Sequence, residues 1–246
     1  MVLSCSHISK SFGTDEIIKD ATFNIEDREK AAIIGINGAG KSTLLKIIVG
    51  ELSADQGEVA FAKDSTYGYL AQHQNLSSDN SIYDEVLSTR QDILSMEASI
   101  RRMEEDMNNL SGNELDTLME QYTRLTHDFD LARGYAYRSK VTGVLKGLGF
   151  GENDFSLNVN TLSGGQKTRV ALSKLLLSKP DIILLDESTN HLDMHSISWL
   201  EGFLSDYKGS VIIVTPDRYF LDKIVSKVIE IDNGTVTTFS CLLYTF

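Results

Sequence analysis

The chain reads Gly35-Ile36-Asn37-Gly38-Ala39-Gly40-Lys41-Ser42 after a short apolar segment, and this stretch fits the pattern G-x-x-x-x-G-K-[ST] without a mismatch. The apolar segment 30–34 predicts a strand, and the periodic apolar residues of 42–49 predict a helix. A glycine-rich turn between a strand and a helix points its N–H groups inward at phosphate oxygens, and the helix N-terminus adds partial positive charge. The stretch therefore predicts a phosphate-binding loop, in which Lys41 reaches the β and γ phosphates and Ser42 holds Mg²⁺.

A second segment carries the acidic groups that such a site needs. Residues 181–185 predict a buried strand, and Asp186 and Glu187 end it. Ligands of open α/β sheets bind at the carboxyl ends of the strands, so both carboxylates are expected near the phosphate loop. Asp186 is placed to bind Mg²⁺ through water, and Glu187 is placed to polarise an attacking water. An acidic turn after a buried strand is common, so this motif indicates a nucleotide site only in combination with the phosphate loop.

A third motif completes the set. Leu162-Ser163-Gly164-Gly165-Gln166 comes just before a predicted helix at 167–177, and alone it reads as a glycine-rich helix start. With the two motifs above it resembles the ATP-binding-cassette (ABC) ATPases, over the whole length of the chain. Two further stretches, DESTNHLD at 186–193 and DRYFLD at 217–222, are similar to the D-E-P-T-N-H-L-D and S-H-D-R-[YF]-F-L patterns of the ABC-F subfamily.

The resemblance implies a site for ATP and Mg²⁺ that two cassettes share. Gln72 resembles the glutamine that couples Mg²⁺ and water to the helical subdomain. Phe12 resembles the aromatic residue that stacks on adenine, with a core phenylalanine as the alternative. Ser163 and Gly165 resemble signature residues that meet the γ-phosphate of a partner cassette's ATP, and Asp193 resembles an aspartate of the dimer interface. The resemblance implies that catalysis depends on Lys41, Gln72 and Glu187, and that the metal is held by Ser42, Gln72 and Asp186. The residues that it implies to bind nucleotide are Phe12, Gly35, Asn37, Gly38, Ala39, Gly40, Lys41, Ser42, Thr43, Ser163, Gly164, Gly165 and Gln166.

The chain departs from the family pattern at two positions of this site. Pro216 stands where the family has a histidine that contacts the γ-phosphate and the attacking water, and Ser188 replaces the proline after the acidic pair. Proline has no side-chain donor and no backbone N–H, so we expect impaired hydrolysis with intact ATP binding. His191 and His195 lie four residues apart, but no convincing third ligand accompanies them, so a metal site there is disfavoured.

Apolar residues in the middle of the chain recur with alternating spacings of three and four. They form two series on either side of Ser111-Gly112-Asn113, which predicts two helices joined by a turn. The simplest product is an antiparallel hairpin whose apolar seam closes on itself; the alternative is a protruding arm that contacts a partner. The two series are Ile93, Met96, Ile100, Met103, Met107 and Leu110, then Leu115, Leu118, Tyr122, Leu125 and Phe129.

This hairpin lies in an insertion of 90 residues between Gln72 and Ser163, longer than the helical subdomain that transport cassettes usually carry there. ABC-F proteins carry an arm at this place, and they often act on the ribosome in translation or antibiotic protection. Between Asp84 and Lys140 there are 12 acidic and 7 basic residues, a net charge of −5. That charge gives no support for contacts with an RNA backbone, so a ribosomal role is implied by the resemblance alone.

Composition narrows the class of protein further. The 246 residues include 23 Lys and Arg against 35 Asp and Glu, and the net charge of −12 argues against binding nucleic acid through bulk charge. The longest aliphatic runs, 182–185 and 211–214, fall far short of the ~20 residues that span a bilayer. No signal peptide is visible, and Cys5 and Cys241 match no metal spacing, so a reduced, cytoplasmic location is expected.

These patterns predict an α/β fold with a P-loop NTPase core of the ABC type, a small antiparallel β subdomain, and a helical subdomain extended by a coiled-coil hairpin. Residues 1–246 are expected to form one ATP-binding domain into which about 73–160 is inserted. A further helix is predicted at 196–207, and further strands at 21–25, 57–62, 66–70, 210–214, 229–232 and 235–239, the last two pairing across Asn233-Gly234.

The chain contains one phosphate loop and one signature, whereas ABC-F proteins have two cassettes. It therefore resembles the N-terminal half of such a protein. The implied partner is a second cassette, from another copy or from a missing C-terminal half. Two competing hypotheses stay open. One is the ATPase subunit of a membrane transporter, whose membrane domain is absent from this chain; the other is an ATP-binding dimerisation module that barely hydrolyses.

Overall fold

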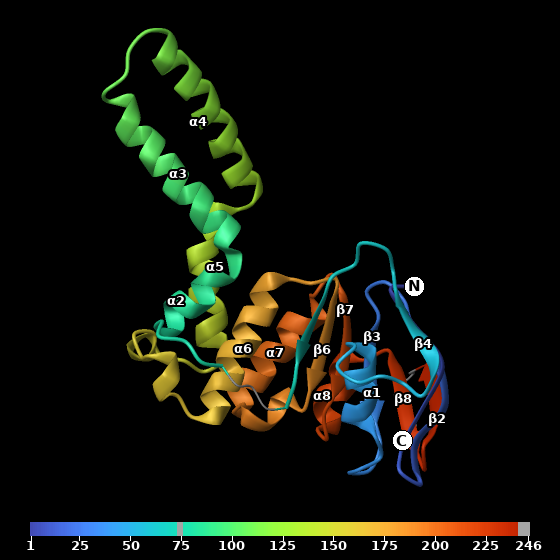
Figure 1. Cartoon of the computed structure of the whole chain (residues 1–246). Helices are drawn as coiled ribbons and strands as arrows, with labels where there is room; N and C mark the ends of the chain where they lie inside the picture. Colours follow the sequence, from blue (N-terminus) through green and yellow to red (C-terminus); the bar gives the residue numbers. More distant parts are fainter. Residues whose placement is uncertain (73–75, 241–246) are drawn as a thin grey trace.

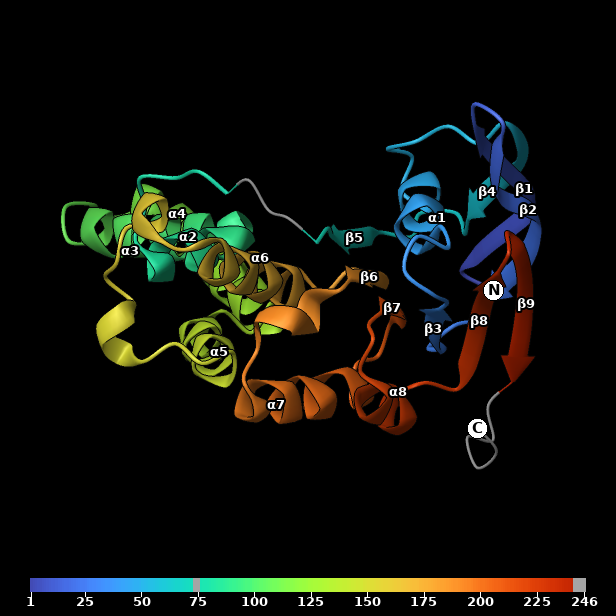
Figure 2. The same cartoon turned by 90° about the horizontal axis from the view of Figure 1, so that it is seen from below.

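Nine strands lie in the part of the chain that the computed structural model describes, residues 1–72 and 76–240. They pair into one sheet in the order β4-β1-β2-β9-β8-β3-β7-β6-β5 (Figures 1 and 2). The hairpin predicted across Asn233-Gly234 is confirmed as the last two strands, and Cys241 lies outside the described residues. The strands are β1 (Leu3–Phe12), β2 (Asp15–Ile25), β3 (Lys30–Ile34), β4 (Gln56–Phe61), β5 (Tyr67–Leu70), β6 (Ile182–Asp186), β7 (Ser210–Val214), β8 (Lys227–Asp232) and β9 (Thr235–Ser240).

The parallel part of the sheet positions the site. Strands β8, β3, β7, β6 and β5 run parallel, each to its neighbour. Strands β3, β6 and β7 are buried nearly throughout, which explains why they read as continuous apolar runs and not as alternating ones. Alternate side chains enter two different cores: Ile183 and Ile213 face one, and Ile182 and Ile212 face the other.

Helices cover both faces of this parallel part. Helix α1 (Lys41–Ile48) packs on one core together with β1 and β2. Helices α6 (Gly164–Ser178), α7 (Met194–Ser205) and α8 (Arg218–Ile224) pack on the other (Figure 1). This layered arrangement confirms the predicted α/β fold class. The short helix α8 was not among the predicted elements.

Strands β4, β1 and β2 pair antiparallel, as predicted for the β subdomain. Strand β1 and the first half of β2 are not among the predicted strands, because the alternation of β1 is interrupted. The register shifts between Cys5 and Ile8, where His7 adopts a positive φ of 55°. On either side of this irregularity Leu3, Cys5 and Ile8 are fully buried, which joins the strand to the core under α1.

The helices between β5 and α6 include a two-helix hairpin that projects away from the sheet (Figure 1). They are α2 (Ile82–Leu87), α3 (Gln91–Met107), α4 (Asn113–Leu131) and α5 (Gly134–Gly147). Helices α3 and α4 pack side by side, and their predicted seam residues are buried or half-buried while most of the other side chains are exposed. One prediction is wrong: Leu110 lies beyond the end of α3, in the turn, because the helix stops at Met107. At the base, Ile93, Ile100 and Phe129 join the core that contains α6.

A close approach between α5 and α7 depends on a glycine. A Cβ at Gly147 would collide with the ring of Trp199, whereas a Cβ at Gly143 of the same helix would meet nothing within 4 Å. We expect Gly147→Ala to lower the free energy of unfolding by about 1–3 kcal/mol, because the added Cβ would lie 2.2 Å from the ring of Trp199 and either the ring or the helix must shift. Gly143→Ala is the matched control and should raise it by about 0.5–1 kcal/mol. Urea denaturation of both variants measures the difference, and equal effects would contradict this packing.

Candidate nucleotide-binding site

The loop between β3 and α1 surrounds an open space. Gly38 and Gly40 adopt positive φ values of 82° and 102°, which favour glycine. A Cβ at Gly40 would lie 2.6 Å from Cγ2 of Ile17, while a Cβ at Gly38 would meet nothing within 4 Å. Helix α1 begins after Gly40 without a side-chain cap. The first N–H groups of the helix can therefore bind an anion at this loop.

Lys41 lies across the same loop. Its ammonium donates hydrogen bonds to the carbonyl oxygens of Gly35 and Ile36, both at 2.9 Å. These acceptors belong to the first two residues of the loop, so the ammonium lies against the start of the phosphate-binding segment.

A pocket of about 500 Å³ opens beside the loop and joins residues that are far apart in the sequence. Phe12 is 52% exposed at the end of β1, so the alternative of a core phenylalanine is wrong. Ile17 of β2 also lines the pocket and was not predicted, since only the pairing of β1 with β2 brings it there. Gly35 and Ala39 belong to the loop but do not line the pocket. The lining residues are Phe12, Ile17, Asn37, Gly38, Gly40, Lys41, Ser42, Thr43, Gln72 and Glu187.

The carboxylate of Asp186 is buried behind this pocket, at the carboxyl end of β6. Its side chain is 2% exposed, and its Oδ1 atom has no hydrogen-bond partner among the described residues. Burial raises the pKa of Asp186, the hydroxyl of Ser42 opposes this by hydrogen bonding, and the charge of Glu187 adds to the rise. A buried carboxylate oxygen without a hydrogen-bond donor is costly, and the hydroxyl beside this carboxylate is a second oxygen of the kind that Mg²⁺ prefers. Both features fit a Mg²⁺ ion.

Glu187 is held in an uncommon conformation directly after Asp186. Its φ of 50° is left-handed, and its N–H group donates to the carbonyl of Val214 at 2.8 Å. Its Oε2 atom accepts hydrogen bonds from Nε2 of Gln72 at 2.7 Å and from Nδ2 of Asn190 at 3.1 Å. The structure therefore brings the predicted pair Gln72 and Glu187 together. Asn190 was not predicted as a site residue, although it lies in the 186–193 motif.

The predicted signature residues lie elsewhere. Ser163 caps α6: its Oγ accepts from the N–H of Gln166 at 3.3 Å, and its own N–H donates to Oε1 of Gln166 at 2.9 Å. Gly164 follows exposed, and Gly165 packs against the ring of His191. None of these four residues lines the pocket beside the phosphate loop. The chain does not bring its own signature to its own phosphate loop.

The two departures from the family pattern flank the acidic pair. Pro216 lies exposed in the turn after β7 and does not line the pocket. Ser188 is buried directly after Glu187, and its hydroxyl has no hydrogen-bond partner among the described residues.

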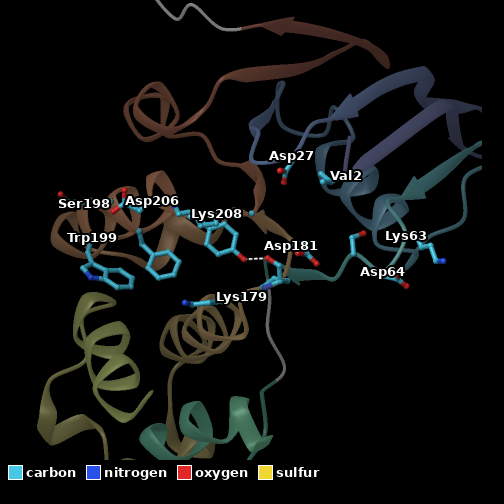
Figure 3. Close-up of a pocket in the computed structure, with 16 residues that line it drawn as sticks. Val2, Asp27, Lys63, Asp64, Lys179, Asp181, Ser198, Trp199, Asp206 and Lys208 are labelled. Atoms are coloured by element: carbon cyan, nitrogen blue, oxygen red, sulfur yellow. Dashed lines mark hydrogen bonds between the residues drawn. The ribbon is translucent and has the colours of Figure 1, made fainter. Parts of the chain in front are cut away.

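A larger hollow of about 830 Å³ lies at the opposite edge of the sheet (Figure 3). It is formed at the amino ends of the parallel strands, next to Asp181, and it is lined by the rings of Trp199 and Phe203 of α7 and of Tyr207 just after that helix. Helix α6 ends here and does not begin here, so the hollow lacks the helix N-terminus that favours phosphate. The smaller pocket therefore has the chemistry for a nucleotide.

Comparison with known proteins shows the family of this chain. Residues 18–190 match the sequence model of the family described as "ABC transporter". The chain is 49% identical to the putative ATP-binding protein YdiF of Bacillus subtilis, over 95% of this chain and 36% of that protein. It is 36% identical to the tylosin resistance ATP-binding protein TlrC of Streptomyces fradiae, over 96% of this chain and 43% of that protein. It is also 36% identical to the energy-dependent translational throttle protein EttA of Mycobacterium tuberculosis, over 95% of this chain and 41% of that protein.

The chain thus spans less than half the length of these three relatives. A solved ATP-binding subunit of an ABC transporter shares the fold, with a TM-score of 0.71 at 18% identity over 98% of this chain and 90% of that one. Among the helices of the described residues, none is both long enough and apolar enough to cross a membrane. On the match to the family and the site that accompanies it, this chain belongs to the ABC family of ATP-binding domains, and ABC-F proteins are among its relatives.

Proposed function

We propose that this chain binds Mg-ATP in the 500 Å³ pocket and hydrolyses it slowly, as one cassette of an ABC-F protein. One observation carries the proposal. The buried Oδ1 of Asp186, which has no hydrogen-bond partner among the described residues, lies beside Ser42 at the end of a complete phosphate loop. A buried anionic oxygen next to an open anion site is the arrangement that a metal bound to a nucleoside triphosphate satisfies.

The binding roles follow from the lining of the pocket. The exposed ring of Phe12 stacks on adenine, and Lys41 binds the β and γ phosphates. The backbone from Gly35 to Thr43 surrounds the phosphates, with Asn37, Gly38, Ala39 and Gly40 in the turn. Ser42, Gln72 and Asp186 hold Mg²⁺, which when bound neutralises charge on the phosphate oxygens.

Hydrolysis depends on Glu187. Its carboxylate faces the pocket and accepts a hydrogen bond from Gln72 at 2.7 Å, so it can orient a water for in-line attack on the γ-phosphate. The carboxylate accepts the proton of the water as the water oxygen bonds to the γ-phosphorus and the bond to the bridging oxygen breaks, with ADP as the leaving group. Pro216 supplies no donor to the phosphate or the water, which leaves this step without one contact that the family pattern contains.

A second cassette completes the site. The signature residues 163–166 cap α6 away from the pocket, so a partner's copy is required at the γ-phosphate. Large apolar side chains at the carboxyl edge of the sheet support a covered face, because Ile36 of the phosphate loop, Met194 at the start of α7 and Tyr219 in the first turn of α8 are all strongly exposed. We take residues 1–246 as one domain with about 73–160 inserted; the partner is either a second copy or the other half of a longer protein.

The cellular role that we propose is in translation or antibiotic protection at the ribosome, in the cytoplasm. The names of two relatives, a translational throttle protein and a tylosin resistance protein, support this. The hairpin α3–α4 projects from the sheet and is available to a large partner (Figure 1). The alternative is an ATPase subunit of a membrane transporter, which the description of the matching family favours. Co-purification with membranes, against co-sedimentation with ribosomes, distinguishes the two.

Nucleotide binding is expected to depend on the ammonium of Lys41. Lys41→Ala should weaken Mg-ATP binding at least tenfold without changing the fold, because it removes the cation from the loop. Lys63→Ala is the matched control, since Lys63 lines the hollow at the other edge of the sheet. Titration calorimetry measures both affinities, and circular dichroism checks the fold. Equal ATP affinity in Lys41→Ala and in the unchanged protein would contradict the assignment.

Association is expected to require nucleotide. We expect a monomer without ATP and, with Mg-ATP, at most a weak two-fold symmetric dimer in which each signature closes the other chain's pocket. Light scattering with and without Mg-ATP measures this. A stable dimer in the absence of nucleotide would contradict the arrangement.

Restoring the missing donor is expected to accelerate hydrolysis. Pro216→His, alone and with Ser188→Pro, should raise turnover by roughly 10²–10³-fold, because one preorganised donor to the transition state contributes on that order. ATP affinity should change little, since Lys41, Ser42 and Asp186 are intact. A phosphate-release assay at saturating Mg-ATP measures turnover. The role given to Pro216 is wrong if the unchanged protein already hydrolyses ATP as fast as Pro216→His.

A further inference from the structure

A buried hydrogen bond joins the two loops that leave the sheet after β6 and β7. Oγ1 of Thr189 lies 2.8 Å from Oγ1 of Thr215, and the two residues are only 5% and 7% exposed. Either hydroxyl can be the donor. Among the described residues this is the one hydrogen bond between side chains of the segments 187–192 and 215–217.

The first of these loops carries Glu187. Thr189 lies two residues after Glu187 and directly before Asn190, whose amide donates to the Glu187 carboxylate at 3.1 Å. Glu187 itself has the left-handed φ of 50°, which an L residue adopts only when its surroundings hold it there. The anchor at Thr189 therefore fixes the short segment that sets both the backbone of Glu187 and one donor to its carboxylate.

The second loop is a firm support for this anchor. Oγ1 of Thr215 also accepts the N–H of Asp217 at 3.2 Å, and Asp217 caps α8 by accepting the N–H of Phe220 at 3.2 Å. The first loop is thus tied through Thr215 to the start of a packed helix. The first loop is also joined to the end of β7 by the backbone hydrogen bond from the N–H of Glu187 to the carbonyl of Val214.

Neighbouring residues add little restraint of their own. Ser188 lacks the fixed φ of a proline, and its buried hydroxyl has no partner among the described residues. Pro216 has no N–H with which to bind the other loop. The hydrogen bond between the two threonine hydroxyls is therefore the side-chain contact that holds the two loops in a fixed position relative to each other.

We propose that Thr189 and Thr215 are positioning residues that hold Glu187 in its hydrolytic orientation. They do not touch the nucleotide and act through the loop that carries Glu187. The proposal rests on the proposed ATP hydrolysis and extends it to two residues for which packing alone requires no hydroxyl. Valine has nearly the same shape as threonine, so a valine pair fills the same space and leaves neither hydroxyl unpaired; the one further bond it removes is that from the N–H of Asp217 to Thr215.

The test compares Thr189→Val, Thr215→Val, the double variant, and the two Thr→Ser variants, each in the unchanged protein and with Pro216→His. Turnover number, KM for Mg-ATP, calorimetric ATP affinity and melting temperature are measured for each. Ser173→Ala is the control, because it removes another buried hydroxyl, one that donates to the carbonyl of Arg169 at 2.9 Å on α6.

The double variant is expected to keep its melting temperature within a few degrees and its ATP affinity and KM within about twofold. Its turnover number should fall about 10- to 100-fold, since a displacement of about 1 Å at a catalytic group costs on that order. Each Thr→Ser variant keeps the hydroxyl and should keep turnover within about threefold. Ser173→Ala should lower the melting temperature and leave turnover unchanged.

Two results overturn the role of the pair alone. One is turnover in the double variant equal to that of the unchanged protein; the other is a loss of turnover that follows melting temperature across all variants, Ser173→Ala included. A third result would also contradict the proposed function. Mg-ATP binding with no turnover in any variant, Pro216→His included, overturns the hydrolytic part of the proposed function and the positioning role with it.

Discussion

The parallel pairing of β3, β7 and β6 is the constraint on which the site depends. These three neighbouring strands are buried on both faces and end at the same edge of the sheet. The phosphate loop leaves β3, the acidic pair ends β6, and Thr215 follows β7, so residues about 150 positions apart in the chain meet without any further device. Hydrophobic burial of the strands thereby fixes the carboxylate of Asp186 where water cannot solvate it. The resulting rise of its pKa expresses that cost.

The sequence predicted those parts of the site that depend on local pattern. The phosphate loop is recognisable because a strand, a glycine-rich turn and a helix follow one another within 20 residues, and β6 and β7 because continuous burial requires continuous apolar runs. The helical hairpin was predictable for the same reason, since its seam repeats every three or four residues. Its exact end was not: Leu110 continues the spacing but lies after the last turn of α3.

Other features depend on pairing between distant segments, which a pattern cannot reveal. Ile17 reaches the pocket only because β2 pairs with β1, and β1 itself is hidden by the irregular register near His7. Asn190 becomes a donor to Glu187 because the chain turns through a left-handed residue. The signature was recognisable as a motif, yet only the fold places it at the start of α6 and outside the chain's own pocket. That separation, with the exposed apolar residues at the carboxyl edge, underlies the proposal of a partner cassette.

The assignment of Mg²⁺ to Asp186 is tested most directly by the melting temperature of Asp186→Asn, with and without Mg-ATP. The raised pKa means that folding favours the protonated carboxyl, so without a cation Asp186 lowers stability as the pH rises above the ordinary range of an aspartate. Without ligand, Asp186→Asn should therefore melt at the same temperature as the unchanged protein or higher. Mg-ATP should raise the melting temperature of the unchanged protein more than ATP with a chelator does, and Asp186→Asn should lose this Mg²⁺-dependent part. A variant that keeps the full Mg²⁺-dependent rise would contradict the assignment.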